Sequence, residues 1–231
     1  VNAAHVKYVP GHKTDKRDSK WLCKLLLAGL LKPSFIPAKE QRELRDLTRY
    51  RTKLIQSKAS NKNRIIRILE DANIKLSSVL SSTSGAVGTR LIDKICEGQS
   101  INMQDIDEVY HKKLQASKED IYEACQGFIT GHHVYMLQTI RQEMDNTQRT
   151  IESLDQRIKE VLSPYGNALE LLKKVPGISS KSVEDLVAEI GLDMGVFPTE
   201  KHLASWAGMS PGNNESAGKK KVDAQPMGTN R

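Results

Sequence analysis

The sequence predicts a mainly α-helical protein, and three observations support this class. Apolar side chains recur at helical spacing through two long stretches, residues 38–71 and 137–161. Proline and glycine separate the shorter apolar stretches where helices commonly end. A strand pattern is weak: residues 1–12 could hold one short strand, which Pro10 and Gly11 would end.

The composition indicates a polyanionic partner. The 231 residues suffice for one or two domains, and 35 Lys and Arg against 28 Asp and Glu give a net charge of +7. Aromatic residues are only 5%, which argues against a stacking platform for single strands. The three cysteines are few and far apart, so neither a disulfide framework nor a zinc site is expected, in keeping with a reducing cytoplasm. We find neither a membrane-length apolar run nor a signal peptide.

Residues 13–29 predict the first helix. Thr14 is placed to cap its start, because a threonine hydroxyl can accept a hydrogen bond from a free amide of the first turn. Gly29 is placed to end it in a left-handed conformation. The apolar residues between them fall on one stripe: Leu22, Leu25 and Leu26.

Asp15 and Asp18 extend this stripe toward the helix start. Charged side chains on a core-facing stripe are costly unless something pairs with them. Mg²⁺ would do so, since it accepts one or two carboxylates and keeps waters for a phosphate substrate. Alternatively, the two acids only complement the positive end of the helix dipole, or Lys16 and Arg17 neutralise them.

A second helix, over about 38–71, has an unusual charge distribution. Acids lie at its start, but residues 47–69 contain none. The same stretch carries seven cations: Arg49, Arg51, Lys53, Lys58, Lys62, Arg64 and Arg67. A helix with a weak leucine seam and one sign of charge is a candidate to lie along a phosphate backbone. The alternative is a solvated face of a helical bundle, although such a face normally mixes both signs.

Residues 117–162 show the clearest periodicity. Eight positions follow strict three–four spacing, and all of them except Thr147 are apolar: Leu137, Ile140, Met144, Thr147, Ile151, Leu154, Ile158 and Val161. This pattern predicts a coiled-coil seam of about three and a half heptads. It would pair either with the basic helix of the same chain or with a second copy.

The segment after Pro164 predicts a helix-hairpin-helix. An apolar helix closes near Val175, residues 176–178 turn, and Ser179 opens a helix ending at Gly191. In such a motif the glycine turn presents backbone amides to a DNA phosphate, and flanking lysines add charge. Lys174, Gly177 and Lys181 are the candidate contacts. The alternative is an ordinary capped helix turn.

Ser216 lies in a glycine-rich stretch beside Lys219, Lys220 and Lys221. A serine there could attack a phosphodiester while the lysines neutralise the developing charge. Most loop serines beside lysines are only solvated, and no neighbouring histidine is placed to activate this one.

Several stretches together resemble the DEDD-type transposases of bacterial insertion sequences, in the insertion-sequence family "one-ten". The resemblance runs from residue 1 to about 221 and is carried by residues 11–18, 30–37, 42–51, 175–178, 202–208 and 211–218. In that family a RuvC-like nuclease domain with four acidic metal ligands precedes a coiled-coil region. A C-terminal transposase domain with a catalytic serine follows.

The resemblance implies roles for three residues. Asp15 and Asp18 match the last two of the four acids, and Ser216 matches the serine. The implied chemistry is cutting and rejoining of DNA through carboxylate-bound Mg²⁺ and a serine nucleophile that forms a covalent phosphoserine. The implied partners are DNA, a guide RNA encoded by the element, and a second copy of the chain through the coiled coil.

The expected organisation has five parts. These are a remnant of a RuvC-like α/β domain, a basic helix, a helical and loop insert, a coiled-coil helix, and a small C-terminal transposase domain with the helix-hairpin-helix. Their expected bounds are 1–35, 36–75, 76–116, 117–164 and 165–231.

The chain also departs from the family pattern. Residues 1–14 contain neither Asp nor Glu, so the family's first Asp and its Glu have no counterpart here, and the pattern fades after residue 221. We therefore expect a chain cut at both ends and inactive alone. The alternative from another class is a non-catalytic protein for nucleic-acid binding and dimerisation.

Overall fold

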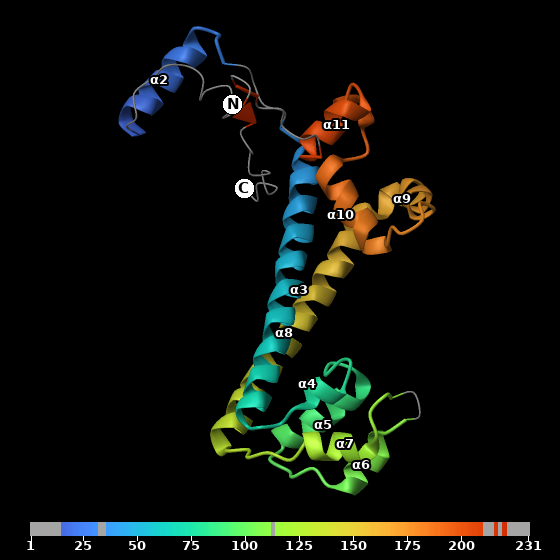
Figure 1. Cartoon of the computed structure of the whole chain (residues 1–231). Helices are drawn as coiled ribbons and strands as arrows, with labels where there is room; N and C mark the ends of the chain where they lie inside the picture. The colour runs from blue at the N-terminus through green and yellow to red at the C-terminus, as the bar shows by residue number, and fades with distance from the viewer. Residues whose placement is uncertain (1–14, 32–35, 112–113, 210–214, 217–218, 221–231) are drawn as a thin grey trace. The chain divides into compact units, whose positions relative to one another are not determined.

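The computed structural model describes residues 15–31, 36–111, 114–209, 215–216 and 219–220, with only the backbone for residues 15–18 and the last four. Helices dominate this part of the chain, which confirms the mainly α class (Figure 1). The chain divides into two compact units, residues 1–43 and 44–231. The predicted strand over 1–12 and the cap at Thr14 lie outside the described residues.

The first unit contains helix α2, Asp15–Leu27. Gly29 ends it as predicted, with a φ of +67° that a side chain would disfavour. The Leu30 amide then donates to the Leu25 carbonyl at 3.0 Å. The apolar stripe is only partly buried, because Leu25 is buried while Leu26 is 65% exposed.

Two long helices run antiparallel in the second unit: α3, Lys39–Asp71, and α8, Gly131–Leu162 (Figure 1). Side-chain pairs join them along their length, from Arg51 with Asp155 through Lys58 with Gln148 to Asp71 with His133. All eight positions of the predicted seam in α8 are buried or half-buried. The seam therefore packs on the basic helix of the same chain, the first of the two pairings that the sequence allows.

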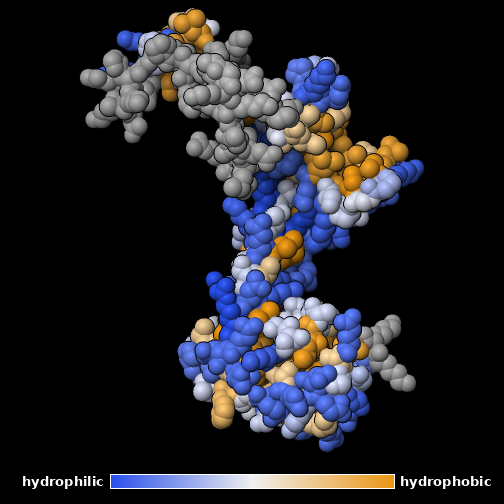
Figure 2. Space-filling view, viewed as in Figure 1, coloured by the Kyte–Doolittle hydropathy of each residue, from blue (hydrophilic) through white to orange (hydrophobic). Residues whose placement is uncertain are grey.

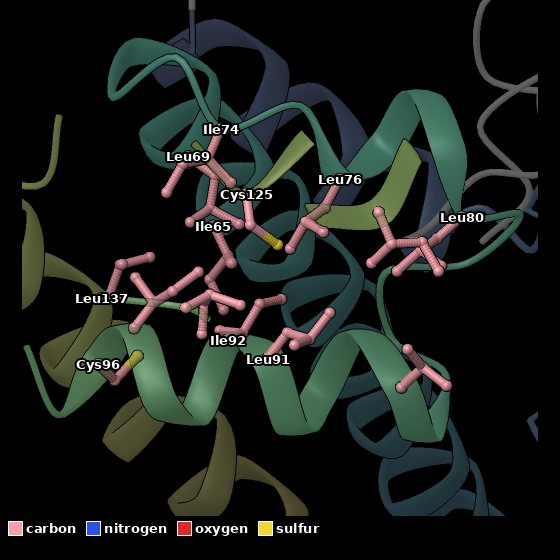
Figure 3. Close-up of a cluster of buried hydrophobic side chains, with 14 of the residues drawn as sticks. Ile65, Leu69, Ile74, Leu76, Leu80, Leu91, Ile92, Cys96, Cys125 and Leu137 are labelled. Carbon is pink, nitrogen blue, oxygen red and sulfur yellow. The ribbon is translucent and has the colours of Figure 1, made fainter. Parts of the chain in front are cut away.

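One end of this hairpin carries the larger apolar cluster. It is built from four short helices that pack on the end of α3 and the start of α8: α4 (Leu76–Val79), α5 (Ala86–Cys96), α6 (Met103–Val109) and α7 (Lys118–Ala124). Figure 3 shows side chains such as Leu69, Leu91 and Leu137 converging from these elements. Cys96 and Cys125 are buried here, and all three cysteines are free.

The other end carries a smaller apolar cluster. Leu44 of α3 and Ile158 of α8 pack there against α10, Ser180–Ile190. A 3₁₀ turn (Ser163–Tyr165) and α9 (Gly166–Lys173) precede α10; a second 3₁₀ turn (Met194–Val196) and α11 (Glu200–Trp206) follow it. The predicted end of α10 is confirmed, since Gly191 has a positive φ, and Gly208 just after α11 also has a positive φ.

The expected single helix over 117–164 is instead two helices, α7 and α8. Residues 125–130 interrupt them because the chain crosses the end of α3 there. The Phe128 amide donates to the Ala72 carbonyl at 2.8 Å, and a Cβ on Gly127 would lie 2.2 Å from that oxygen. Thr130 then starts α8 in a capping box with His133.

Among the described residues, strands occur only as a short hairpin. Glu215–Ser216 (β1) pairs antiparallel with Lys219–Lys220 (β2), where the sequence suggests only a glycine-rich loop. None of the described helices has the length and apolar character needed to cross a membrane.

Candidate nucleic-acid interface

The cations of α3 occupy three different environments. Between residues 47 and 69 the helix contains no acid, so its own charges cannot neutralise them. Acids from α8 and α10 lie against part of this stretch instead. The structure therefore separates the cations that hold the fold together from those that face solvent.

Arg51 is a buried structural tie. Its side chain is 1% exposed, and its guanidinium donates to Asp155 at 2.9 Å, Glu184 at 2.5 Å and Asp185 at 2.8 Å. Burial alone lowers the pKa of Arg51, but these carboxylate hydrogen bonds outweigh it and raise the pKa above its ordinary value. Arg51 is not available to a phosphate, and the expectation of a nucleic-acid contact is withdrawn for it.

Arg45 and Arg49 also face α10. Arg49 donates through Nε and Nη2 to the two carboxylate oxygens of Glu189, at 2.7 and 2.9 Å. This bidentate hydrogen bond, the main cause, raises the pKa of Arg49. Arg45 donates through Nε to the Ala188 carbonyl at 2.9 Å. The guanidinium of Arg49 is therefore already bound to a carboxylate, and Arg49 is less available to a phosphate than an unpaired cation would be.

Three cations of α3 are exposed in the acid-free stretch 47–69: Lys53, Arg64 and Arg67. We call them the basic stripe. Lys53 and Arg64 are eleven residues apart, close to three helical turns, and Arg67 follows in the next turn, so the three lie along one side of α3. Arg64 is held in place by donating to Asn61 Oδ1 at 2.7 Å. Figure 2 shows hydrophilic residues covering most of this hairpin's visible surface.

Lys58 and Lys62 lie on the flank of α3 that packs toward α8 and α5, and both are half-buried. Lys58 donates to Gln148 Oε1 at 2.6 Å across the hairpin. These two lysines differ from the basic stripe because they line a cavity rather than an open surface.

The turn between α9 and α10 has the geometry of a tight helical hairpin. Gly177 has a φ of +85° and faces open space, so no side chain covers its backbone. Ser179 caps α10 by accepting from the Ser182 amide at 3.1 Å. Lys174 is exposed, whereas Lys181 donates to Asp155 at 3.0 Å. The turn therefore offers one open lysine and an open backbone.

The catalytic candidates fall in two places that the structure describes separately. Asp15 and Asp18 lie in the first turn of α2. Ser216 lies in β1, where the backbone register sets it directly opposite Lys219, with Lys220 next to it in β2. Where side chains are described, no group of three or more His, Cys, Asp or Glu could hold a metal ion.

Two family models match the chain. Residues 1–74 match the DEDD model of the IS110 type, described as a transposase, and residues 169–229 match a model described as the IS116/IS110/IS902 transposase family. Together they cover more than half of the sequence. The chain belongs to the IS110 family of transposases. No curated protein and no solved structure matches it.

In this IS110-family transposase the two matched segments meet at α3 and α10. The first supplies Arg45, Arg49 and Arg51, and the second supplies Glu184, Asp185 and Glu189. Sequence analysis missed these acids as partners. The available signal was their spacing, since residues 185 and 189 are four apart and share a helix face with residue 184 beside them.

Proposed function

We propose that this transposase holds a nucleic-acid backbone along the basic stripe of α3. The observation that carries the proposal is the exposure of Lys53, Arg64 and Arg67 in a stretch without any acid. The stripe spans fourteen residues, about 21 Å of helix, which corresponds to roughly six base-pair steps. Lysine and arginine side chains at that separation can neutralise several phosphates of one strand.

A second contact is proposed at the turn between α9 and α10. The open backbone at Gly177 and the exposed Lys174 suit a phosphate oxygen. Lys181 contributes less, because Asp155 already neutralises it. This assignment extends the helix-hairpin-helix interpretation of the sequence.

For the chemistry, we propose that Ser216 attacks a phosphodiester of DNA. The new bond joins its oxygen to phosphorus, the bond to the departing strand breaks, and that strand leaves as a hydroxyl that takes up the serine proton. Lys219 and Lys220, in the facing strand, would offset the negative charge that develops. The support is the family match and the register of β1 with β2.

Asp15 and Asp18 are the proposed ligands of Mg²⁺. Two carboxylates one turn apart on a helix are hard oxygen ligands that this cation accepts. Bound Mg²⁺ would supply charge stabilisation at the phosphate.

The proposed partners are DNA, a guide RNA from the same element and a second copy of the chain. A second copy would have to use a surface other than the seam of α8, because α3 of the same chain already covers that seam.

The nucleic-acid surface is tested by binding to duplex DNA and structured RNA as KCl is raised. We expect the triple variant Lys53→Ala, Arg64→Ala, Arg67→Ala to reduce the salt slope by about three, at about 0.9 per phosphate contact. A matched triple on α8, Arg149→Ala, Arg157→Ala, Lys159→Ala, removes the same charge and should leave the slope unchanged. An equal reduction of the salt slope in both triple variants, or no binding of the wild-type chain at low salt, would contradict the proposal.

The alternative function is nucleic-acid binding without catalysis. Incubation of labelled DNA with the chain and Mg²⁺ separates the two. A covalent adduct that Ser216→Ala abolishes, with DNA affinity retained, supports the transposase chemistry. Because the chain is expected to be inactive alone, the incubation is repeated with an intact family member added. No adduct on this chain in either case, with binding intact, favours the alternative.

A further inference from the structure

A cavity of about 250 Å³ lies between α3, the loop before α5, α5 and α8. Three cations line it: Lys58, Lys62 and Arg141. Three residues that carry hydroxyl groups line it as well: Thr83, Ser84 and Thr89. Except for the α3 residues, this lining comes from the segment 75–168, which neither family model matches.

The charge of the cavity is positive. Its described lining contains one carboxylate, Asp145, which is exposed. Arg141 is paired with Asp93, and Lys58 uses one of its three Nζ hydrogens on Gln148. Lys62 makes no ion pair with any residue that the structure describes. With Asp93 counted, three cations stand against two carboxylates, and the excess of one positive charge favours an anion over a neutral or cationic ligand.

The hydroxyl side of the cavity is held in place by close backbone packing. A Cβ on Gly88 would lie 2.3 Å from the Thr83 carbonyl oxygen, so α5 and the loop touch at a position that only glycine permits. The loop closes on itself where the Gly85 amide donates to the Ser82 carbonyl at 3.1 Å. Thr83 and Ser84 are therefore fixed relative to Thr89, which reduces the cost of ordering them around a ligand.

We propose that this cavity binds a phosphate group. Lysine ammonium groups and hydroxyl donors around a positively charged cavity suit the several acceptor oxygens of a phosphate. The site is separate from the basic stripe, because Lys58 and Lys62 face α5 and α8 whereas the stripe faces solvent. It does not depend on the function proposed above. The phosphate comes either from a nucleic-acid strand or from a free phosphate compound, which share this chemistry.

Titration of the ¹⁵N-labelled full chain with inorganic phosphate, at constant ionic strength, tests the site. We expect saturable shifts of the Ser84 and Thr89 amide signals. Lys62→Met and Ser84→Glu should each weaken phosphate binding about tenfold or more. The first removes a charged hydrogen-bond donor, and the second places a carboxylate where it repels the phosphate. The matched controls Lys75→Met and Ser81→Glu make the same charge changes outside the cavity and should titrate like wild type. Shifts that do not saturate, or equal weakening in variants and controls, would overturn the proposal.

A second arm identifies the source of the phosphate. Affinities for duplex DNA and structured RNA are compared between Ser84→Glu and Ser81→Glu. A loss confined to Ser84→Glu supports a strand phosphate in the cavity. Unchanged strand affinity together with saturable inorganic phosphate binding supports a free phosphate compound. Failure of the basic-stripe variants to alter strand binding would count against the proposed function and leave this titration unaffected.

Discussion

Arg49 and Glu189 are 140 residues apart in the sequence, yet the Arg49 guanidinium donates to both carboxylate oxygens of Glu189, at 2.7 and 2.9 Å. Arg49 belongs to the segment that matches the N-terminal family model, and Glu189 to the segment that matches the C-terminal one. With Arg51 and its three carboxylates alongside, charge pairs link the two matched segments at one end of the hairpin.

Arg51→Met should destabilise the chain strongly. It removes the buried cation and leaves Glu184 without its guanidinium and Asp155 with Lys181 alone, a loss expected to cost about 3 kcal/mol. Urea unfolding followed by circular dichroism measures the change. Lys53→Met makes the same charge change at an exposed position and should stay within about 0.5 kcal/mol. A cost below about 1 kcal/mol for Arg51→Met would show that the tie contributes little.

Asp155 should make stability depend on acid pH. Burial raises the pKa of Asp155, but hydrogen bonds from Arg51 and Lys181 outweigh it and hold the pKa below its ordinary value. A depressed folded-state pKa stabilises the fold above the unfolded-state value near 4, and this contribution is lost as pH falls through the folded-state pKa. The stability gap between wild type and Asp155→Asn should therefore shrink from pH 7 to pH 3. A gap that stays constant in urea unfolding over this range would rule out this linkage.

Gly127→Ala should disturb the crossing of residues 125–130 over the end of α3. The added Cβ would meet the Ala72 carbonyl oxygen at 2.2 Å and Ile74 Cγ1 at 2.7 Å, so the backbone has to move. We expect a loss of about 1–3 kcal/mol, typical of overpacking. Gly131→Ala is the matched control, because its Cβ meets nothing within 4 Å and alanine favours a helix. Thermal unfolding of both variants tests this, and the midpoint of Gly127→Ala should be lower than that of Gly131→Ala. Similar midpoints would contradict the prediction.

Asn61→Leu should stabilise the hairpin. Asn61 is fully buried on α3, and its Nδ2 has no hydrogen-bond partner in the part of the chain that the structure describes. Leucine has a similar volume and removes this unsatisfied donor, at the cost of the hydrogen bond from the exposed Arg64, for an expected net gain of up to about 1 kcal/mol. A buried asparagine in a helix pair can also fix register, so the gain should come with a broader mixture of oligomers on size exclusion. Asn63→Leu changes an exposed residue of the same helix and should produce neither effect.

Local signals in the sequence predicted much of the fold. Helical spacing, the Ser179 cap and Gly191 place α3 and α10 to within a few residues, and the three–four spacing of residues 137–161 predicts most of α8 but not its start. The break before α8 escaped prediction because the reason for Gly127 is a backbone contact with residue 72, far away in sequence.

The candidate site was less predictable. Charge alone indicated the cations of α3 as candidate contacts. The role of Arg51 depends on acids more than a hundred residues away in the sequence, and its sequence neighbours do not indicate that it is buried. The cavity beside Lys62 combines residues from four separate elements, so no single stretch of sequence indicates it.

The two apolar clusters are joined through a middle where Arg51, Lys58 and Asn61 stand in place of seam leucines. Salt screens exposed charges beyond a Debye length of about 8 Å under physiological conditions, but it screens buried pairs much less. Because Arg51 is buried, its carboxylate pairs tie α3 to α8 and α10 in concentrated salt as well as in dilute buffer. The exposed cations of the basic stripe, by contrast, are screened by salt, so nucleic-acid binding is expected to weaken at salt concentrations that leave this buried tie intact.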